Sequence, residues 1–153
     1  MAGTYHQTFA ADVAKWAHDI EGAIEAIFKE SVQELVAEAD RLLTQLVYEA
    51  PPSQNYRRTG FLRSSVRATR TAMPLADRPQ GVPDADYLAE ITVVIAGSEL
   101  GETLYVGYTA NYAAFVHFGT SRMSGRPWVQ MIAQRWPAIV AAKEAELRSR
   151  LGL

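Results

Sequence analysis

The residues best suited to chemistry in this chain lie in the stretch ANYAAFVHFGTSRMSGRPWV, residues 110–129. His117 stands there among aromatic side chains, and Ser121 and Ser124 follow it closely. A histidine that acts as a general base needs a nucleophile and an orienting carboxylate, yet neither serine sits in a Gly-x-Ser-x-Gly turn. The remaining histidines, His6 and His18, offer no metal-ligand spacing with His117. We therefore interpret His117 as a packed or interface residue and predict no catalytic residue, no metal and no cofactor.

Other common chemistries lack their residues. The chain has no cysteine, which excludes disulfides, thiol catalysis and cysteine-zinc sites. Its glycines form neither of the two common phosphate-binding patterns. No apolar run approaches the roughly 20 residues that span a bilayer, and no secretory signal is visible. We expect a protein made in the cytoplasm, without a membrane partner and without enzymatic activity.

Charge is distributed in blocks, although the net charge is only −2. The first fifty residues are acidic, and residues 51–83 carry six arginines against Asp77 alone. These arginines could pair with carboxylates of a neighbouring copy, contact DNA, or simply be solvated. Only three lysines and an acidic total argue against a dedicated nucleic-acid binder. We therefore favour pairing between subunits for the arginine block, which comprises Arg57, Arg58, Arg63, Arg67 and Arg70.

Periodicity predicts the elements that position these residues. Apolar spacings of three and four predict a helical region over residues 8–49, with a break near HDIEG at 18–22, ended by Pro51-Pro52. Alternation predicts a strand at about 62–72, with a helical turn at 60–64 as an alternative start. Three prolines and no periodicity predict a projecting loop over 74–86.

The second half of the chain reads as a mixture of strands and helices. We expect a hairpin at about 87–109, a short helix at 111–118 and a C-terminal helical region over 127–151. Pro137 either kinks that last helix or starts a further one. The sum is a single α+β domain over residues 1–153, in which a long N-terminal helix and a C-terminal helix pack on a small antiparallel β-sheet.

Three motifs in this order resemble the head–tail joining and tail-completion proteins of long-tailed double-stranded DNA bacteriophages. The first is Thr-Gly-x-Leu-x-x-Ser at residues 59–65, and the second is Tyr-Ala-x-x-Val at 112–116 followed by Gly119-Thr120. The third is Arg-Pro-Trp at 126–128, ahead of a closing helix. The chain departs from the family at His117, where a glutamate is usual, and at Trp128, where a phenylalanine is usual. A titrating group thus replaces a permanent charge at residue 117.

The resemblance implies a structural virion protein that is assembled in the host cytoplasm and resides in the neck or tail. It would form a ring, a hexamer in this family, and meet the tail-tube or tail-terminator protein, the head-closure and connector proteins, and the genomic DNA in the channel. A close alternative is a tail terminator that caps tail-tube polymerisation. More distant alternatives are a small DNA-binding module and an enzyme that uses His117.

Aromatic and arginine side chains are the types enriched where proteins meet. Beyond the arginine block, they cluster in the second and third motifs and the turn between them. The interface candidates there are Tyr112, Phe115, His117, Phe118, Thr120, Arg122, Arg126 and Trp128.

Overall fold

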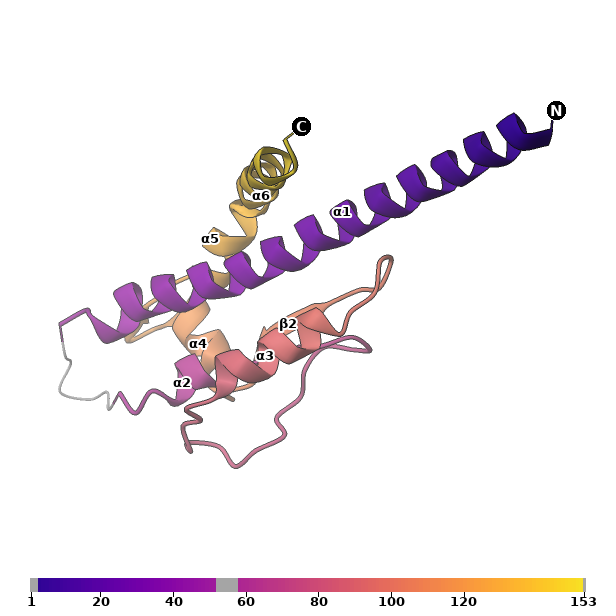
Figure 1. Cartoon of the computed structure of the whole chain (residues 1–153). Coiled ribbons are helices and arrows are strands. Elements are labelled where there is room, and N and C mark those ends of the chain that lie inside the picture. The colour runs from indigo at the N-terminus through magenta and orange to yellow at the C-terminus, as the bar shows by residue number, and fades with distance from the viewer. Residues whose placement is uncertain (1–2, 52–57, 153) are drawn as a thin grey trace.

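The computed structural model describes residues 3–51 and 58–152, and Arg57 lies outside these ranges. The chain has an α+β fold in which a long N-terminal helix, two C-terminal helices and two small antiparallel sheets pack together. Figure 1 shows the N-terminal helix running along the whole body and continuing well beyond it.

The N-terminal helix α1 spans Gly3–Leu43, and a π-helical turn, η1, continues it over Thr44–Tyr48. The predicted break near residues 18–22 is wrong, because the helix runs through it without interruption. A single glycine in a helix interior costs only about 1 kcal/mol, and nothing lies within 4 Å of a side chain built at Gly22. The sequence there contains no proline that would force a break.

The first sheet pairs strand β1, Val66–Thr69, with strand β2, Tyr105–Tyr108, in antiparallel register with Val66 opposite Tyr108. A short helix, α2, Phe61–Ser64, precedes β1. The strand is therefore shorter than the predicted 62–72, and the alternative of a helical turn at its start is confirmed.

The segment between the two strands corrects the predicted hairpin at 87–109. Residues Tyr87–Ala96 form helix α3, and only β2 is a strand. Tyr87, Ile91 and Ile95 recur every four residues and are all buried, which is the pattern of one helix face. The β-branched composition of YLAEITVVIA favoured a strand, but packing against β1 decides the outcome.

The C-terminal part contains the predicted short helix, α4, Ala113–Phe118, and two helices in the predicted C-terminal region: α5, Trp128–Gln134, and α6, Trp136–Leu151. Pro137 lies in the first turn of α6, where a missing N–H costs nothing, so it starts a helix. A two-residue hairpin separates α4 from α5, with β3, Gly119–Thr120, paired to β4, Met123–Ser124.

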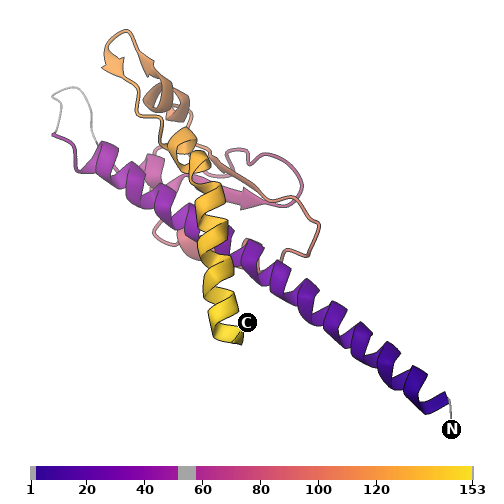
Figure 2. The ribbon, with the colours of Figure 1, turned by 90° about the horizontal axis from the view of Figure 1, so that it is seen from above.

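Two apolar clusters hold these elements to α1. The first joins the C-terminal end of α1 to α2, α4 and α5, and the second joins the middle of α1 to β1 and α3. Figure 2 shows α6 crossing α1 on the side away from the sheet, where Ile139 is buried. The core therefore lies against the C-terminal half of α1 alone.

Candidate functional site

The three motifs converge in the first apolar cluster. Leu62, Val116 and Trp128, one from each motif, are all buried there. The rings of Tyr108 and Trp128 meet edge to face with their centroids 5.2 Å apart. Trp128, one of the interface candidates, is only 1% exposed, so it lies in the core of its own chain and not at the surface. Tyr112 is half-buried, with its ring 6.2 Å from that of Phe61.

Two glycines close the β3–β4 hairpin at its base. Gly119 has φ of 86° and ψ of 174°, a conformation that is essentially restricted to glycine. A side chain built on Gly119 would come within 2.5 Å of the Gly125 nitrogen. The backbone N–H of Arg126 then donates to the carbonyl of Val116 at 2.9 Å. This contact fixes the direction in which the hairpin leaves α4, and the hairpin presents Thr120 and Arg122 to solvent.

His117 is held by its neighbours in α4 and α5. Its Nε2 accepts a hydrogen bond from the backbone N–H of Gln130 at 3.3 Å, and its ring meets those of Phe118 and Trp128 edge to face. Burial lowers the pKa of His117, because the charged imidazolium is poorly solvated there. Its Nδ1 contacts no acceptor in the described part of the chain, so no carboxylate orients the ring for base catalysis.

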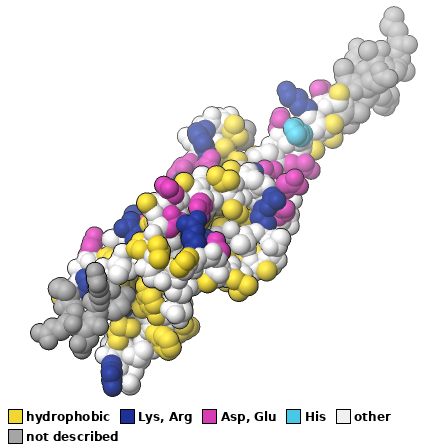
Figure 3. Space-filling view, turned by 90° about the horizontal axis from the view of Figure 1, so that it is seen from below, with side chains coloured by type: hydrophobic (Ala, Val, Ile, Leu, Met, Phe, Trp, Pro, Cys, Tyr) yellow, Lys and Arg dark blue, Asp and Glu magenta, His cyan; other side chains and the backbone are white. Residues whose placement is uncertain are grey.

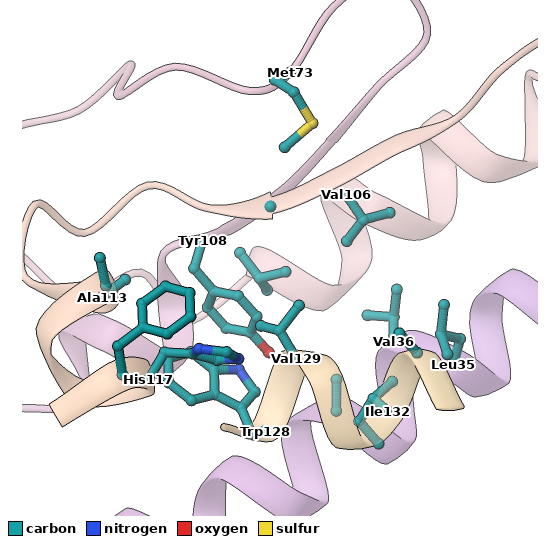
Figure 4. A pocket seen from close by; sticks show the side chains of 16 residues that line it. Leu35, Val36, Met73, Val106, Tyr108, Ala113, His117, Trp128, Val129 and Ile132 are labelled. Carbon is teal, nitrogen blue, oxygen red and sulfur yellow. The ribbon is translucent and has the colours of Figure 1, made fainter. Parts of the chain in front are cut away.

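An open apolar groove of about 370 Å³ runs beside His117 (Figure 4). It lies between α1, the β1–β2 sheet, α4 and α5, and Met73 lies at one end of it. None of its lining residues carries a carboxylate, an amine, a guanidinium or an aliphatic hydroxyl. They are Leu35, Val36, Ala39, Val66, Met73, Val106, Gly107, Tyr108, Ala113, Ala114, His117, Phe118, Trp128, Val129, Ile132 and Ala133.

Exposed apolar side chains surround this groove. Phe118 is 78% exposed and Phe115, on the same helix, is 60% exposed. Val129 and Met73, which both line the groove, are also exposed. These two phenylalanines are thus at the surface, and they stand on a helix whose opposite face is fixed by the buried Val116.

The arginine block is largely occupied within its own chain. Arg58 binds the end of the N-terminal helical segment, where its guanidinium donates to the carbonyls of Tyr48, Ala50 and Pro51. The last carbonyls of a helix lack N–H partners within the helix, and an arginine side chain can supply donors there. Arg58 is therefore a helix cap, a role that its position in the sequence did not reveal.

Arg63 forms a partly buried cluster with Asp40 and Tyr87. Its Nε and Nη2 donate to the two carboxylate oxygens of Asp40 at 3.0 and 2.8 Å, and the Tyr87 hydroxyl donates to Oδ1 of the same carboxylate at 2.6 Å. The hydrogen bonds to Asp40 raise the pKa of Arg63 above its ordinary value. Burial and the hydrogen bond to Asp40 raise the pKa of Tyr87 to about 12. The cluster joins α1, α2 and α3.

Arg67 ties the loop over 74–86 to the sheet. Its guanidinium is buried, donates to the carbonyls of Ser64 and Val66 at 2.8 Å, and lies 3.4 Å from Asp77 and 3.6 Å from Asp84. The loop is irregular and largely exposed, as predicted. The carboxylates that Arg63 and Arg67 contact belong to their own chain, so a reversal of these two charges would disturb the fold.

The remaining arginines of the candidate set are at the surface. Arg70 pairs with Glu102 at 3.3 Å and donates to the carbonyl of Gly97. Arg122 and Arg126, at the hairpin, have no carboxylate within 4.0 Å among residues 3–51 and 58–152. These two therefore remain available to a partner.

One surface feature was missed in the sequence. Residues 11–22 of α1 are exposed on all sides, and apolar side chains at and just beyond them face solvent: Val13, Trp16, Ile20 and Ile24. Their spacing of three and four predicts a face that packs on the core of the same chain, whereas the structure leaves these side chains in solvent. The length of the helical region could have indicated this exposure, because a small domain cannot cover a helix of 41 residues along its whole length.

The described residues include no group of three or more histidine, aspartate or glutamate side chains placed to hold a metal ion. No helix in the described ranges is long and apolar enough to cross a bilayer. The chain matches no protein-family model, no curated protein and no solved structure.

Proposed function

We propose that this chain is a structural protein of a long-tailed bacteriophage particle that assembles into a ring, a hexamer by family resemblance, at the neck or the top of the tail. In this role it completes the tail and joins it to the DNA-filled head. It acts through surfaces that bind other copies of itself and its neighbours in the particle, and it needs no catalytic centre. The ordered motifs at residues 59–65, 112–120 and 126–128 suggest this assignment.

The observation that carries the proposal is apolar exposure at two separate places. One is the stripe on residues 13–24 of α1, and the other is the groove with Phe115 and Phe118 beside it. Soluble monomers rarely expose large contiguous apolar patches, and those that do generally use them to bind a partner. Two different patches on one chain are what a ring requires, since each subunit then offers one patch to each neighbour.

The packing of the motifs supports a structural role. Leu62, Val116 and Trp128 of the three motifs share one apolar core, and Gly119 sets the path of the β3–β4 hairpin, so these motif residues shape the fold and its surface. The groove, in turn, is lined by no carboxylate, amine, guanidinium or aliphatic hydroxyl, and its lining is mostly apolar. Both features favour an assembly protein over the enzyme that uses His117.

Native mass spectrometry of the purified chain tests the proposal. We expect a species whose mass is a fixed multiple of 16.9 kDa, and negative-stain images that show a ring with a central channel. A chain that stays monomeric at every concentration, and that is missing from phage particles released by the strain that encodes it, would refute the proposal.

Deletion of the gene tests the place of the protein in the particle. A tail-completion protein should leave DNA-filled heads beside free tails of normal length, because the tube forms but cannot join. Tails of abnormal length would instead assign the chain to the tail terminators.

A further inference from the structure

The N-terminal part of α1, residues 11–24, is an unsupported helical arm. Figures 1 and 2 show it leaving the body as a straight continuation of α1. Its four exposed apolar residues fall within one narrow stripe, because positions 13, 16, 20 and 24 lie on one side of an α-helix. Trp16 is the largest of them and is 66% exposed.

A helix in this situation gains little stability from its own chain. Isolated helices of this length are marginal in water, and most helical stability in proteins comes from packing an apolar face. The stripe on the arm packs against nothing in the described structure, since residues 11–22 are all exposed. The arm therefore has the properties of a segment that is covered in the assembled state.

The groove has the complementary properties. It is apolar and open, and Phe118 and Val129 at its side are themselves exposed. Recognition of an amphipathic helix by a hydrophobic groove uses anchors at spacings of three, four and seven residues. The arm offers anchors at those spacings in Val13, Trp16 and Ile20, and Ile24 continues the stripe four residues further on.

The arm cannot enter the groove of its own chain. Leu35 of α1 lines that groove, and Trp16 lies nineteen residues earlier on the same continuous helix. At 1.5 Å of rise per residue, the two positions are about 28 Å apart along the helix axis. Only another molecule can bring an arm to this groove.

The charges on the arm and near the groove indicate that this other molecule is a second copy of the chain. Within residues 11–24, Asp12, Asp19 and Glu21 outnumber Lys15 and leave a net charge of −2 (one base minus three acids). Figure 3 shows acidic side chains beside hydrophobic ones on the arm. Near the groove, at the end of α4, Arg122 and Arg126 have no carboxylate partner among the described residues. The acidic arm and the basic hairpin can pair when the stripe enters the groove.

We infer that the arm of one copy docks in the groove of the next, with its acidic side chains at the β3–β4 hairpin. This inference rests on the proposed function, because it specifies how neighbouring subunits of the ring hold one another. The contact joins two different surfaces, so each copy gives an arm to one neighbour and receives an arm from the other. Such head-to-tail contacts close into rings when the rotation between subunits allows it.

Disulfide trapping between two variants tests this contact, since the natural chain has no cysteine that could compete. One batch carries Trp16→Cys and the other, with a different tag, carries Val129→Cys. After mixing and mild oxidation, we expect a disulfide-linked dimer that contains both tags. The matched control replaces Val129→Cys with Val93→Cys on the outer face of α3, which is 72% exposed and does not line the groove. We expect no mixed dimer from it.

The same positions test the energetic role of the contact. Trp16→Glu and Val129→Glu should each raise the dissociation constant of the oligomer by about 30-fold or more, the effect of losing an interface hot spot. Val93→Glu should leave this constant unchanged. All three side chains are exposed in the single chain, so the unfolding midpoint of the isolated subunit should remain close to that of the natural protein.

The outcomes separate this inference from the proposed function. If the natural chain assembles but the Trp16→Cys chain links only to itself, the arms pair with each other and the docking contact is wrong. If it assembles and both glutamate variants assemble equally well, the ring stands and the docking contact is again wrong. If the natural chain never assembles, both proposals fail together.

Discussion

The cluster of Arg63, Asp40 and Tyr87 gives a sharp test of whether the arginine block serves the fold or a neighbour. We consider Arg63→Met, which keeps most of the aliphatic stem and removes the guanidinium. The Asp40 side chain is only 10% exposed, and after the change it retains the Tyr87 hydroxyl but loses both hydrogen bonds from Arg63. A buried carboxylate without its cation is strongly unfavourable.

The size of the loss in stability depends on how deeply Arg63 and Asp40 are each buried. Breaking a fully buried ion pair costs about 3–5 kcal/mol. The Arg63 side chain is 41% exposed, so water already screens part of the attraction and lowers the loss. We therefore expect Arg63→Met to reduce the free energy of unfolding by about 2–3 kcal/mol. Arg63→Glu should reduce it further, because it places a second negative charge beside Asp40.

Urea denaturation followed by tryptophan fluorescence measures this loss, at fixed protein concentration since self-association shifts apparent stability. The matched control is Arg70→Met, which removes an exposed pair with Glu102 and should cost less than about 1 kcal/mol. If Arg63→Met and Arg70→Met prove equally mild, the Asp40 contact contributes little. Arg63 would then be free to serve a neighbouring subunit, and our reasoning about its role would be wrong.

Three further predictions concern the hairpin and the titrating groups. Gly119→Ala should lower the free energy of unfolding by at least about 2 kcal/mol, because it adds a clash with Gly125 to a conformation that only glycine adopts easily. The control Gly60→Ala, which has open space around it, should cost about 1 kcal/mol, and urea titration compares the two variants. Because burial lowers the pKa of His117, the unfolded chain binds more protons than the folded chain just below pH 6.5. The free energy of unfolding should therefore fall as pH drops through this value. His117→Gln should weaken that pH dependence, and an unchanged profile would count against the burial of His117 as its cause. Because the pKa of Tyr87 is raised to about 12, its contribution to the free energy of unfolding is complete below pH 10 and is lost as pH rises from 10 towards 12. Tyr87→Phe should flatten that part of the alkaline unfolding curve. An identical curve would contradict the raised pKa of Tyr87.

Local patterns in the sequence were sufficient where one periodicity dominated. The spacing of apolar residues and Pro51-Pro52 predicted the helical character and the end of the first segment, although not its continuity through residues 18–22, and the turn chemistry around Gly119 predicted the end of α4. The strand at Tyr105–Tyr108 also followed from its composition. In each of these segments, local propensity favours the structure that forms, so no information from distant residues was needed.

The segment Tyr87–Ala96 was mispredicted because two signals conflict there. Its β-branched residues favour a strand, and its buried residues at every fourth position favour a helix. A short apolar run cannot be assigned by periodicity alone. The choice was made by the surface of β1, on which a helical face of Tyr87, Ile91 and Ile95 packs.

The candidate site divides in the same way. The sequence by itself determined which residue types gather at the motifs, and hence that an arginine block and an aromatic cluster exist. Only the tertiary structure decided which of them face outward, because burial and pairing depend on residues far away in the chain. Arg63 pairs with Asp40, which lies 23 positions earlier in the chain. Trp128 is buried in the core, whereas Trp16 and Phe118 remain exposed. The residues next to a charged or aromatic side chain in the sequence do not reveal which distant group it will contact, because the fold brings that group to it.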